Sequence, residues 1–247
     1  MKAENNRWRC KKRKCRYSKS IFYKSIFSGS RLNASSIMLL AYFWLSGDTH
    51  QTIINKTSHS PSTVTNFLND FRNLVSSDIK EQKQKIGGDG IIVEIDESKF
   101  GKRKYHKGHH VEGVWVFGGV ERTPERKMFA ISIPNRSGEI LLKVIEENIL
   151  PGSIIYSDCW AGYNEIQDRL PMVHWTVNHS KYFKDPITGV HTNTIEGTWH
   201  GLKIKISNRN RNENDINKHL FEAIWRRNNS GNLWIAFISC LVNTSYK

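Results

Sequence analysis

Three acidic residues far apart in the sequence have the surroundings expected of a cation site. Asp96 and Asp158 each end a short apolar run that predicts a buried strand, and Glu196 lies early in a helix-like stretch, 194–203. Carboxylates on two strands and a helix can converge on Mg²⁺ or Mn²⁺, which prefer oxygen ligands and share phosphate oxygens. We therefore expect a divalent-metal site at the carboxyl end of a sheet, where open α/β folds place their sites.

The helix that carries Glu196 strengthens this interpretation, because either Asp alone could simply cap a turn. The apolar residues of this helix, predicted over 194–206, form one stripe: Ile195, Trp199, Leu202 and Ile206. Glu196, His200 and Lys203 share a different face, and Asn193 lies one turn earlier. A carboxylate and a lysine two turns apart can serve one phosphodiester, the first on metal and the second on a phosphate oxygen. A Glu–Lys face is also common on solvated helices.

Positive charge is concentrated at the beginning of the chain. The 247 residues carry a formal net charge of +14, and the pI is near 9.7. Residues 1–31 contain eleven Lys and Arg and one acid, Glu4, so about ten of the net charges lie there. A basic segment beside a nearly balanced body is typical of contact with nucleic-acid phosphates. A basic terminus that is merely solvated would have the same composition.

The composition also bears on the compartment. The longest apolar run, 37–45, is far shorter than the ~18 residues of a membrane span, so no membrane partner is expected. Four cysteines do not form a disulfide framework in a chain of this length, which indicates a reducing compartment. That compartment would be the nucleus in a eukaryote, with the basic run 11–14 as an address, and otherwise the cytoplasm or nucleoid. Cys159, beside Asp158, is expected to be a small buried residue.

Two small regions are predicted before the acidic residues. Residues 1–31 form a basic arm in which Cys10 and Cys15 supply half of a four-ligand zinc site, which favours a zinc-ribbon remnant or two simple thiols over a complete ribbon. Residues 32–80 predict a buried helix, a short helix and an amphipathic helix that starts at Pro61 after a Ser60 cap. This order resembles a helix-turn-helix that would enter a DNA groove, although polar helix faces are often only solvated.

The remainder of the chain predicts an α/β domain. Residues 81–90 are polar and glycine-rich and predict a linker, and residues 91–247 predict the catalytic domain. Strands are expected at 91–96, 112–120, 127–133, 153–157 and 172–177, with an amphipathic helix before the fourth. Further helices are expected at 194–206, 213–228 and 231–242. This order gives a mixed sheet flanked by helices and is compatible with a ribonuclease H-like fold.

One loop in this domain has a distinctive composition. It combines several histidines with four bases: His106, His109, His110, Lys102, Arg103, Lys104 and Lys107. Zinc binding is one explanation, but the basic cluster favours a loop that contacts DNA.

Three segments together resemble a known family. The segments are VEIDES at 93–98, GVWVFGGVER at 113–122 and HTNTIEG at 191–197. They are similar, in the same order, to segments of the DDE transposases of Merlin-type DNA transposons and their bacterial insertion-sequence relatives. The resemblance covers roughly residues 90–230. It implies a ribonuclease H-like core, two divalent metals (Mg²⁺ or Mn²⁺) in each active site, and double-stranded transposon-end and target DNA as substrates. It also implies a homo-oligomer when two ends are synapsed.

The resemblance assigns roles by position. The metal-binding triad is Asp96, Asp158 and Glu196, Lys203 matches the basic residue two turns beyond the Glu, and Asn193 matches the Asn before it. Two metals would activate the attacking oxygen and stabilise the leaving one, first with water and then with a 3′-hydroxyl as nucleophile. Two alternatives remain: a domesticated DNA-binding protein, and a ribonuclease H-like nuclease without strand transfer.

Overall fold

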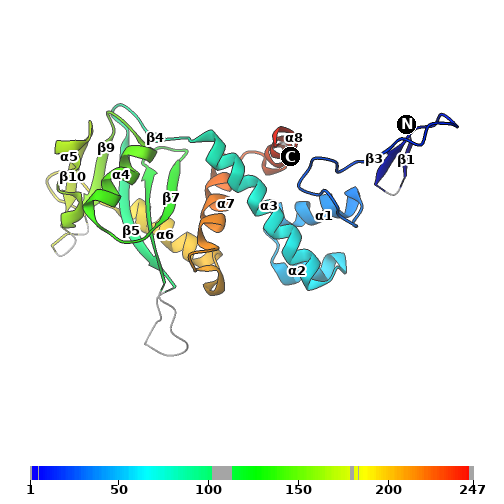
Figure 1. Cartoon of the computed structure of the whole chain (residues 1–247). Helices are drawn as coiled ribbons and strands as arrows, with labels where there is room; N and C mark the ends of the chain where they lie inside the picture. The colour runs from blue at the N-terminus through cyan, green and yellow to red at the C-terminus, as the bar shows by residue number, and fades with distance from the viewer. Residues whose placement is uncertain (1, 5, 102–112, 179–180, 183, 245–247) are drawn as a thin grey trace. The chain divides into compact units, whose positions relative to one another are not determined.

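The computed structural model describes residues 2–4, 6–101, 113–178, 181–182 and 184–244 (Figure 1). The chain divides into two compact units. The first contains Met1–Asp78 and Asn229–Lys247, and the second contains Ile79–Asn228. Within the described residues, no helix is both long and apolar enough to cross a membrane.

The first unit begins with a small antiparallel sheet. It contains β1 (Lys2–Glu4), β2 (Arg7–Arg9) and β3 (Ser18–Ser20), so the predicted basic arm is partly folded. Hydrogen bonds from the backbone of Lys12 and from Cys15 lower the pKa of the Cys10 thiol, which shows that the two thiols are close. No group of three or more His, Cys, Asp or Glu suited to a metal occurs in the described part of the chain, so a zinc site stays a prediction.

The first unit also contains the helices α1 (Ala34–Leu45), α2 (His50–Thr57) and α8 (Leu233–Asn243), and α3 (Pro61–Gln82) as far as Asp78. The Ser60 hydroxyl accepts a hydrogen bond from the Thr63 amide, which confirms the predicted cap of α3. Ring centroids of Trp44, Phe71 and Phe237 lie 5.4–5.9 Å apart and join α1, α3 and α8. The apolar face of α8 packs with α1 and α3. Residues 229–247 of the expected catalytic domain, 91–247, therefore belong to the first unit.

The second unit contains a five-stranded mixed sheet with the order β10-β9-β5-β6-β7. Its strands are β5 (Ile92–Phe100), β6 (Val114–Glu121), β7 (Met128–Ile133), β9 (Ile154–Asp158) and β10 (Val173–Val177). The first three are antiparallel, whereas β9 and β10 run parallel to β5. All five lie close to the predicted positions, because apolar runs bounded by turns mark buried strands well.

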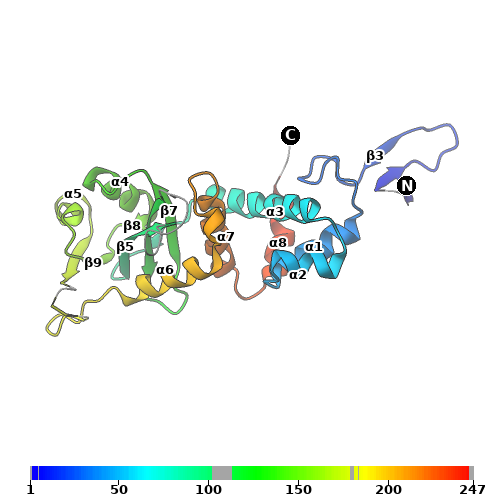
Figure 2. The same cartoon turned by 90° about the horizontal axis from the view of Figure 1, so that it is seen from below.

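Helices cover both faces of this sheet (Figure 2). On one face, α4 (Gly138–Asn148), η1 (Ala161–Tyr163) and α5 (Ile166–Arg169) pack on Val93, Ile95 and Phe117. On the other, α6 (Asn193–Lys205) and α7 (Ile216–Asn228) pack on Phe100 and Val116. A short η2 (Asn208–Asn210) connects α6 to α7. The predicted mixed sheet flanked by helices is confirmed.

The predicted linker is part of this unit. Within 81–90, β4 (Ile86–Gly87) pairs in parallel with β8 (Ile149–Leu150), and the Ile86 side chain is buried. The Gly87 amide also donates to Glu121 Oε1 at 2.8 Å. These contacts fix the position of the backbone just before β5, the first strand of the five-stranded sheet.

Strand β5 presents different chemistry on its two faces, since successive side chains of a strand alternate. Val93 and Ile95 belong to the core beneath α4, whereas Glu94, Asp96 and Ser98 contact α6. The sequence predicted that Asp96 ends its strand, and this prediction is wrong, because β5 continues to Phe100. The pairing of β5 with β6 continues to Phe100, whereas its pairing with the parallel strand β9 stops at Glu94. Beyond Glu94, β5 therefore has a strand neighbour on one side only.

Candidate active site

Asp96 and Asp158 are brought together by the register of two parallel strands. Glu94 of β5 pairs with Tyr156 of β9 as the last pair of the ladder. Two residues further along each strand, Asp96 and Asp158 extend from the same face, because side chains repeat every second residue. The Asp158 charge acts on Asp96, which confirms their proximity.

The carboxylate pair lies in a partly buried, negatively charged environment. Burial, followed by the charges of Glu97 and Asp158, raises the pKa of Asp96 to about 7. Burial and the Asp158 charge also raise the pKa of Glu97, and burial with these same carboxylates raises that of Tyr163 well above its usual value. Glu97 Oε1 and the Tyr163 hydroxyl are both buried, and the interaction of Glu97 with Tyr163 lowers the pKa of Glu97 against the effect of burial. The mutual repulsion of these carboxylates would be relieved by a cation, and divalent cations prefer oxygen ligands.

The raised pKa of Asp96 predicts how stability depends on pH in chelator-containing buffer. Between its ordinary pKa near 4 and about 7, Asp96 ionises in the unfolded chain but stays protonated when folded, so the free energy of unfolding falls as pH rises. The loss from this group reaches about 4 kcal/mol above pH 7. When chemical denaturation is measured across this pH range, the free energy of unfolding of Asp96→Asn should rise relative to that of the wild type as pH rises. A constant difference between them would contradict the prediction.

Helix α6 is attached to the sheet by a buried carboxylate. Glu94 is fully buried, and its carboxylate accepts hydrogen bonds from the Thr194 amide (2.7 Å), the Thr194 hydroxyl (2.8 Å) and the Ile195 amide (3.0 Å). A negative charge at a helix N-terminus satisfies amides that lack intrahelical partners and complements the helix dipole. Glu94 therefore fixes the first turn of α6, which carries Glu196.

Two cationic or polar side chains complete the environment of Glu94. Arg122 Nε lies 3.4 Å from Glu94 Oε1, and His191 Nδ1 lies 3.6 Å from the same oxygen. Arg122 also hydrogen-bonds His191 Nε2. Burial and the Arg122 charge lower the pKa of His191, which favours the neutral ring. The His191 and Arg122 of the recognised segments thus hold the acid that caps α6.

Trp199 joins α6 to the carboxylate pair. Its side chain is buried, as the apolar stripe predicted, and its indole N–H donates to Asp96 Oδ2 at 3.0 Å. Gly118 lies opposite Asp96 in the β5–β6 ladder, and a Cβ there would approach Trp199 Cη2 to 2.6 Å. The glycine therefore provides the space in which the indole reaches Asp96.

We expect Gly118→Ala to destabilise the second unit by about 1–3 kcal/mol, the usual range for an overpacked core. The added methyl also meets the Phe129 carbonyl oxygen at 2.6 Å, which backbone pairing prevents from moving freely. Gly201→Ala is the matched control. No atom lies within 4 Å of that added Cβ, and alanine should stabilise α6 by up to about 1 kcal/mol. Equal denaturation midpoints for the two variants would contradict this account.

Lys203 also lies at the carboxylate pair. Its Nζ donates to the Ser98 hydroxyl at 2.6 Å, and the negative charge of Asp96 acts on it. Burial and the neighbouring Arg211 lower the pKa of Lys203, while Asp96 opposes that effect. Arg211 donates to the carbonyl oxygens of Lys203 and Ile206, which fixes the end of α6. A cation two turns beyond Glu196 is thus placed beside Asp96.

Glu196 and Asn193 occupy the first turn of α6. Glu196 is exposed, and its Oε1 accepts a 3.3 Å hydrogen bond from the Thr192 hydroxyl. The described residues contain no group of three or more acidic, His or Cys side chains that could share one metal, so Glu196 does not join the pair of aspartates here. Asn193 Oδ1 is buried without a hydrogen-bond partner. The roles of both residues stay predictions.

The contributors without an assigned role in the sequence interpretation include Glu94, Ser98 and Gly118. Glu94 could have been noticed, because a lone acid in an apolar strand needs buried partners. Ser98 and Gly118 gave no comparable signal, since their importance depends on strand register and on the position of α6. Cys159 was predicted to be buried, but it is exposed beyond the end of β9.

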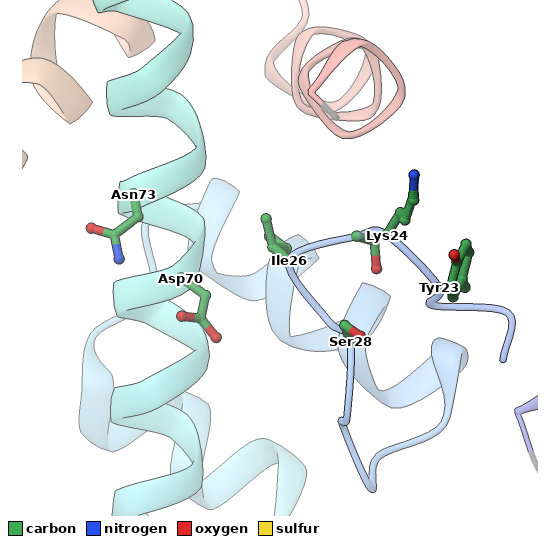
Figure 3. Close-up of a pocket in the computed structure, with 7 residues that line it drawn as sticks. Tyr23, Lys24, Ile26, Ser28, Asp70 and Asn73 are labelled. Carbon is green, nitrogen blue, oxygen red and sulfur yellow. The ribbon is translucent and has the colours of Figure 1, made fainter. Parts of the chain in front are cut away.

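The basic, His-rich loop 102–110 lies outside the described residues. A cavity of about 460 Å³ in the first unit is lined by residues of the segment 23–28 and by Asp70 and Asn73 of α3 (Figure 3). Its lining includes none of the predicted catalytic residues.

Comparisons with known proteins agree with the recognised segments. Residues 84–228 match the family described as ISXO2-like transposase domain. An uncharacterized transposase-like protein of Haemophilus influenzae is 30% identical over 105 residues, which cover 42% of this chain and 83% of that relative.

Solved structures give a much weaker likeness. A pre-cleavage Mos1 transpososome shares 7% identity with a TM-score of 0.26, over 86% of this chain and 79% of that one. The Mos1 strand transfer complex shares 9% identity with a TM-score of 0.25, over 84% and 77%. These scores are too low to support a conclusion about fold or function.

Proposed function

The chain belongs to the family of ISXO2-like transposase domains, and from this premise we propose that it cuts and joins DNA strands as a DDE transposase of the Merlin type. The five-stranded mixed sheet would be its ribonuclease H-like catalytic core. The observation that carries the proposal is the carboxylate pair Asp96–Asp158, which is partly buried where the parallel ladder ends. The cation of Lys203 lies near Asp96.

The carboxylates would hold the cations. Asp96 and Asp158 supply hard oxygen ligands that suit Mg²⁺ or Mn²⁺, and we assign Glu196 as the third ligand, from the exposed first turn of α6. Two bound cations would supply activation of the attacking oxygen and stabilisation of the leaving oxygen during displacement at phosphorus.

The remaining side chains would position these groups and the DNA. Trp199 holds the Asp96 carboxylate in one orientation through its indole N–H. Lys203, oriented by Ser98, would bind a phosphate oxygen of the strand being cut. Asn193, whose buried amide oxygen lacks a partner, would orient the first turn of α6 when DNA is bound.

DNA binding would involve the first unit. Residues 1–31 carry most of the net positive charge, and α2 and α3 have the order expected of a helix-turn-helix. We propose that they recognise transposon ends, that target DNA enters the second unit, and that two copies of the chain synapse the ends. The protein would then act where DNA is, in a nucleus or nucleoid.

The direct test uses purified full-length protein, supercoiled plasmid and duplexes that carry the element's own flanking inverted repeats. A transposase should nick the ends with Mg²⁺ or Mn²⁺ and then join the 3′-ends to the plasmid. Nicking without joined product would favour the nuclease alternative. DNA binding without nicking would favour a domesticated DNA-binding protein, and loss of both would refute the proposal.

A further inference from the structure

Near Glu97, an arginine contacts the rings of two tryptophans, one of which also contacts Lys99. The Arg136 guanidinium carbon lies 4.2 Å from the ring centroid of Trp115 and 4.6 Å from that of Trp160. These residues come from three separate segments: β6, the connection between β7 and α4, and the turn after β9. Both distances lie within the ~6 Å range of cation–π contact.

The turn that carries Trp160 fixes the orientation of its indole. A Cβ at Gly162 would approach Trp160 Nε1 to 2.7 Å, so the ring lies directly against the Gly162 backbone. Trp160 nevertheless keeps 39% of its surface exposed. The cluster is therefore built into the fold and still accessible to a ligand.

This cluster is attached to the candidate active site. The Trp160 amide donates to Asp158 Oδ1 at 2.9 Å, so the aromatic residue is placed by one of the proposed metal ligands. The positive charge of Arg136 also acts on the Glu97 carboxyl and opposes the rise in its pKa. A ligand at Arg136 would thus lie near Glu97, at the end of the sheet that carries Asp158.

The chemistry of arginine indicates what that ligand is. When indoles contact the faces of a guanidinium, its N–H donors remain along the edge of the plane, where they match two oxygens of a phosphate. Within the described residues, Arg136 forms no ion pair with an Asp or Glu. Its charge acts on Glu97 without a direct ion pair, so its N–H donors can bind an anionic ligand.

We propose that Arg136, oriented by Trp115 and Trp160, binds a backbone phosphate of the DNA strand close to the scissile one. This inference rests on the proposed function and adds a substrate-binding residue to it. Trp160 would then lie within reach of the neighbouring nucleobase, because bases stack readily on exposed aromatic rings.

Photo-crosslinking of the full chain tests this proposal without requiring cleavage. The probe is a nicked duplex with 5-bromodeoxyuridine on both sides of the nick, with Ca²⁺ in place of Mg²⁺. Irradiation should crosslink Trp160 in the wild type, as mapped by mass spectrometry. Arg136→Gln should lower this yield about tenfold, the effect of losing one charge-assisted hydrogen bond, and Arg136→Lys should lower it less.

Arg169→Gln is the matched control, because this exposed arginine is already paired with Glu139 and Glu165. It should leave the Trp160 crosslink unchanged. Crosslinks elsewhere in the chain with none at Trp160, or a Trp160 crosslink that persists in a folded Arg136→Gln variant, would overturn the inference and leave DNA binding intact. Absence of any crosslink would refute the proposed DNA substrate and the inference together.

Discussion

We expect Asp96→Asn to reduce Mg²⁺-dependent nicking of supercoiled plasmid by about a hundredfold to a thousandfold, the range for losing one preorganised electrostatic group. The reason is charge: the amide keeps the size of the side chain and can still accept from Trp199, but it no longer neutralises a cation. Asp158→Asn and Glu196→Gln should lose activity in the same way. Affinity for duplex DNA, measured by fluorescence anisotropy, should stay unchanged in all three.

Asp168→Asn is the control for this series, since Asp168 is an exposed acid on α5 of the same unit. It should nick at the wild-type rate. Rapid nicking by a folded Asp96→Asn variant would remove Asp96 from the cation site. If only Glu196→Gln were active, the site would consist of the two aspartates, in keeping with the exposed position of Glu196.

We expect Glu94→Ala to lower the free energy of unfolding of the second unit by about 3–5 kcal/mol, the usual result of breaking a buried charged network. The substitution removes the acceptor of three hydrogen bonds from Thr194 and Ile195 and leaves Arg122 without its carboxylate. Chemical denaturation followed by circular dichroism measures the loss. Glu94→Gln should recover part of it, because one acceptor oxygen remains.

Glu196→Gln provides the contrast, because the two acids lie at the same end of α6. Glu196 is exposed, so its substitution should change stability by less than about 1 kcal/mol even though it lowers activity. The two acids would thus separate into one that holds the helix and one that acts on DNA. Similar stability losses for both would contradict this division.

The sequence predicted the second unit well because its signals are local. Each strand is an apolar run bounded by turn residues, and the stripe Ile195, Trp199, Leu202 and Ile206 is buried as expected. Asp158 ends its strand, and Lys203 reaches the Asp96 side of the sheet, because both depend only on where an element ends or which face it presents.

Features that depend on how elements pair were harder to predict. Asp96 lies within β5 because the antiparallel neighbour continues to Phe100, and the sequence does not reveal which neighbour is longer. Periodicity showed that α8 is a helix, but an apolar face does not identify its partner, and α8 packs in the first unit. The contacts of Glu94 and Gly118 with α6 likewise require the register and the docked helix.

The alternation along β5 has a consequence for how this protein can change. Glu94, Asp96 and Ser98 share a face only because each is two residues from the next. Insertion or deletion of a single residue inside β5 would move every side chain that follows it to the opposite face, so that acids would enter the apolar layer under α4. Related chains should therefore vary freely in loop length around this strand while the spacing within it stays constant.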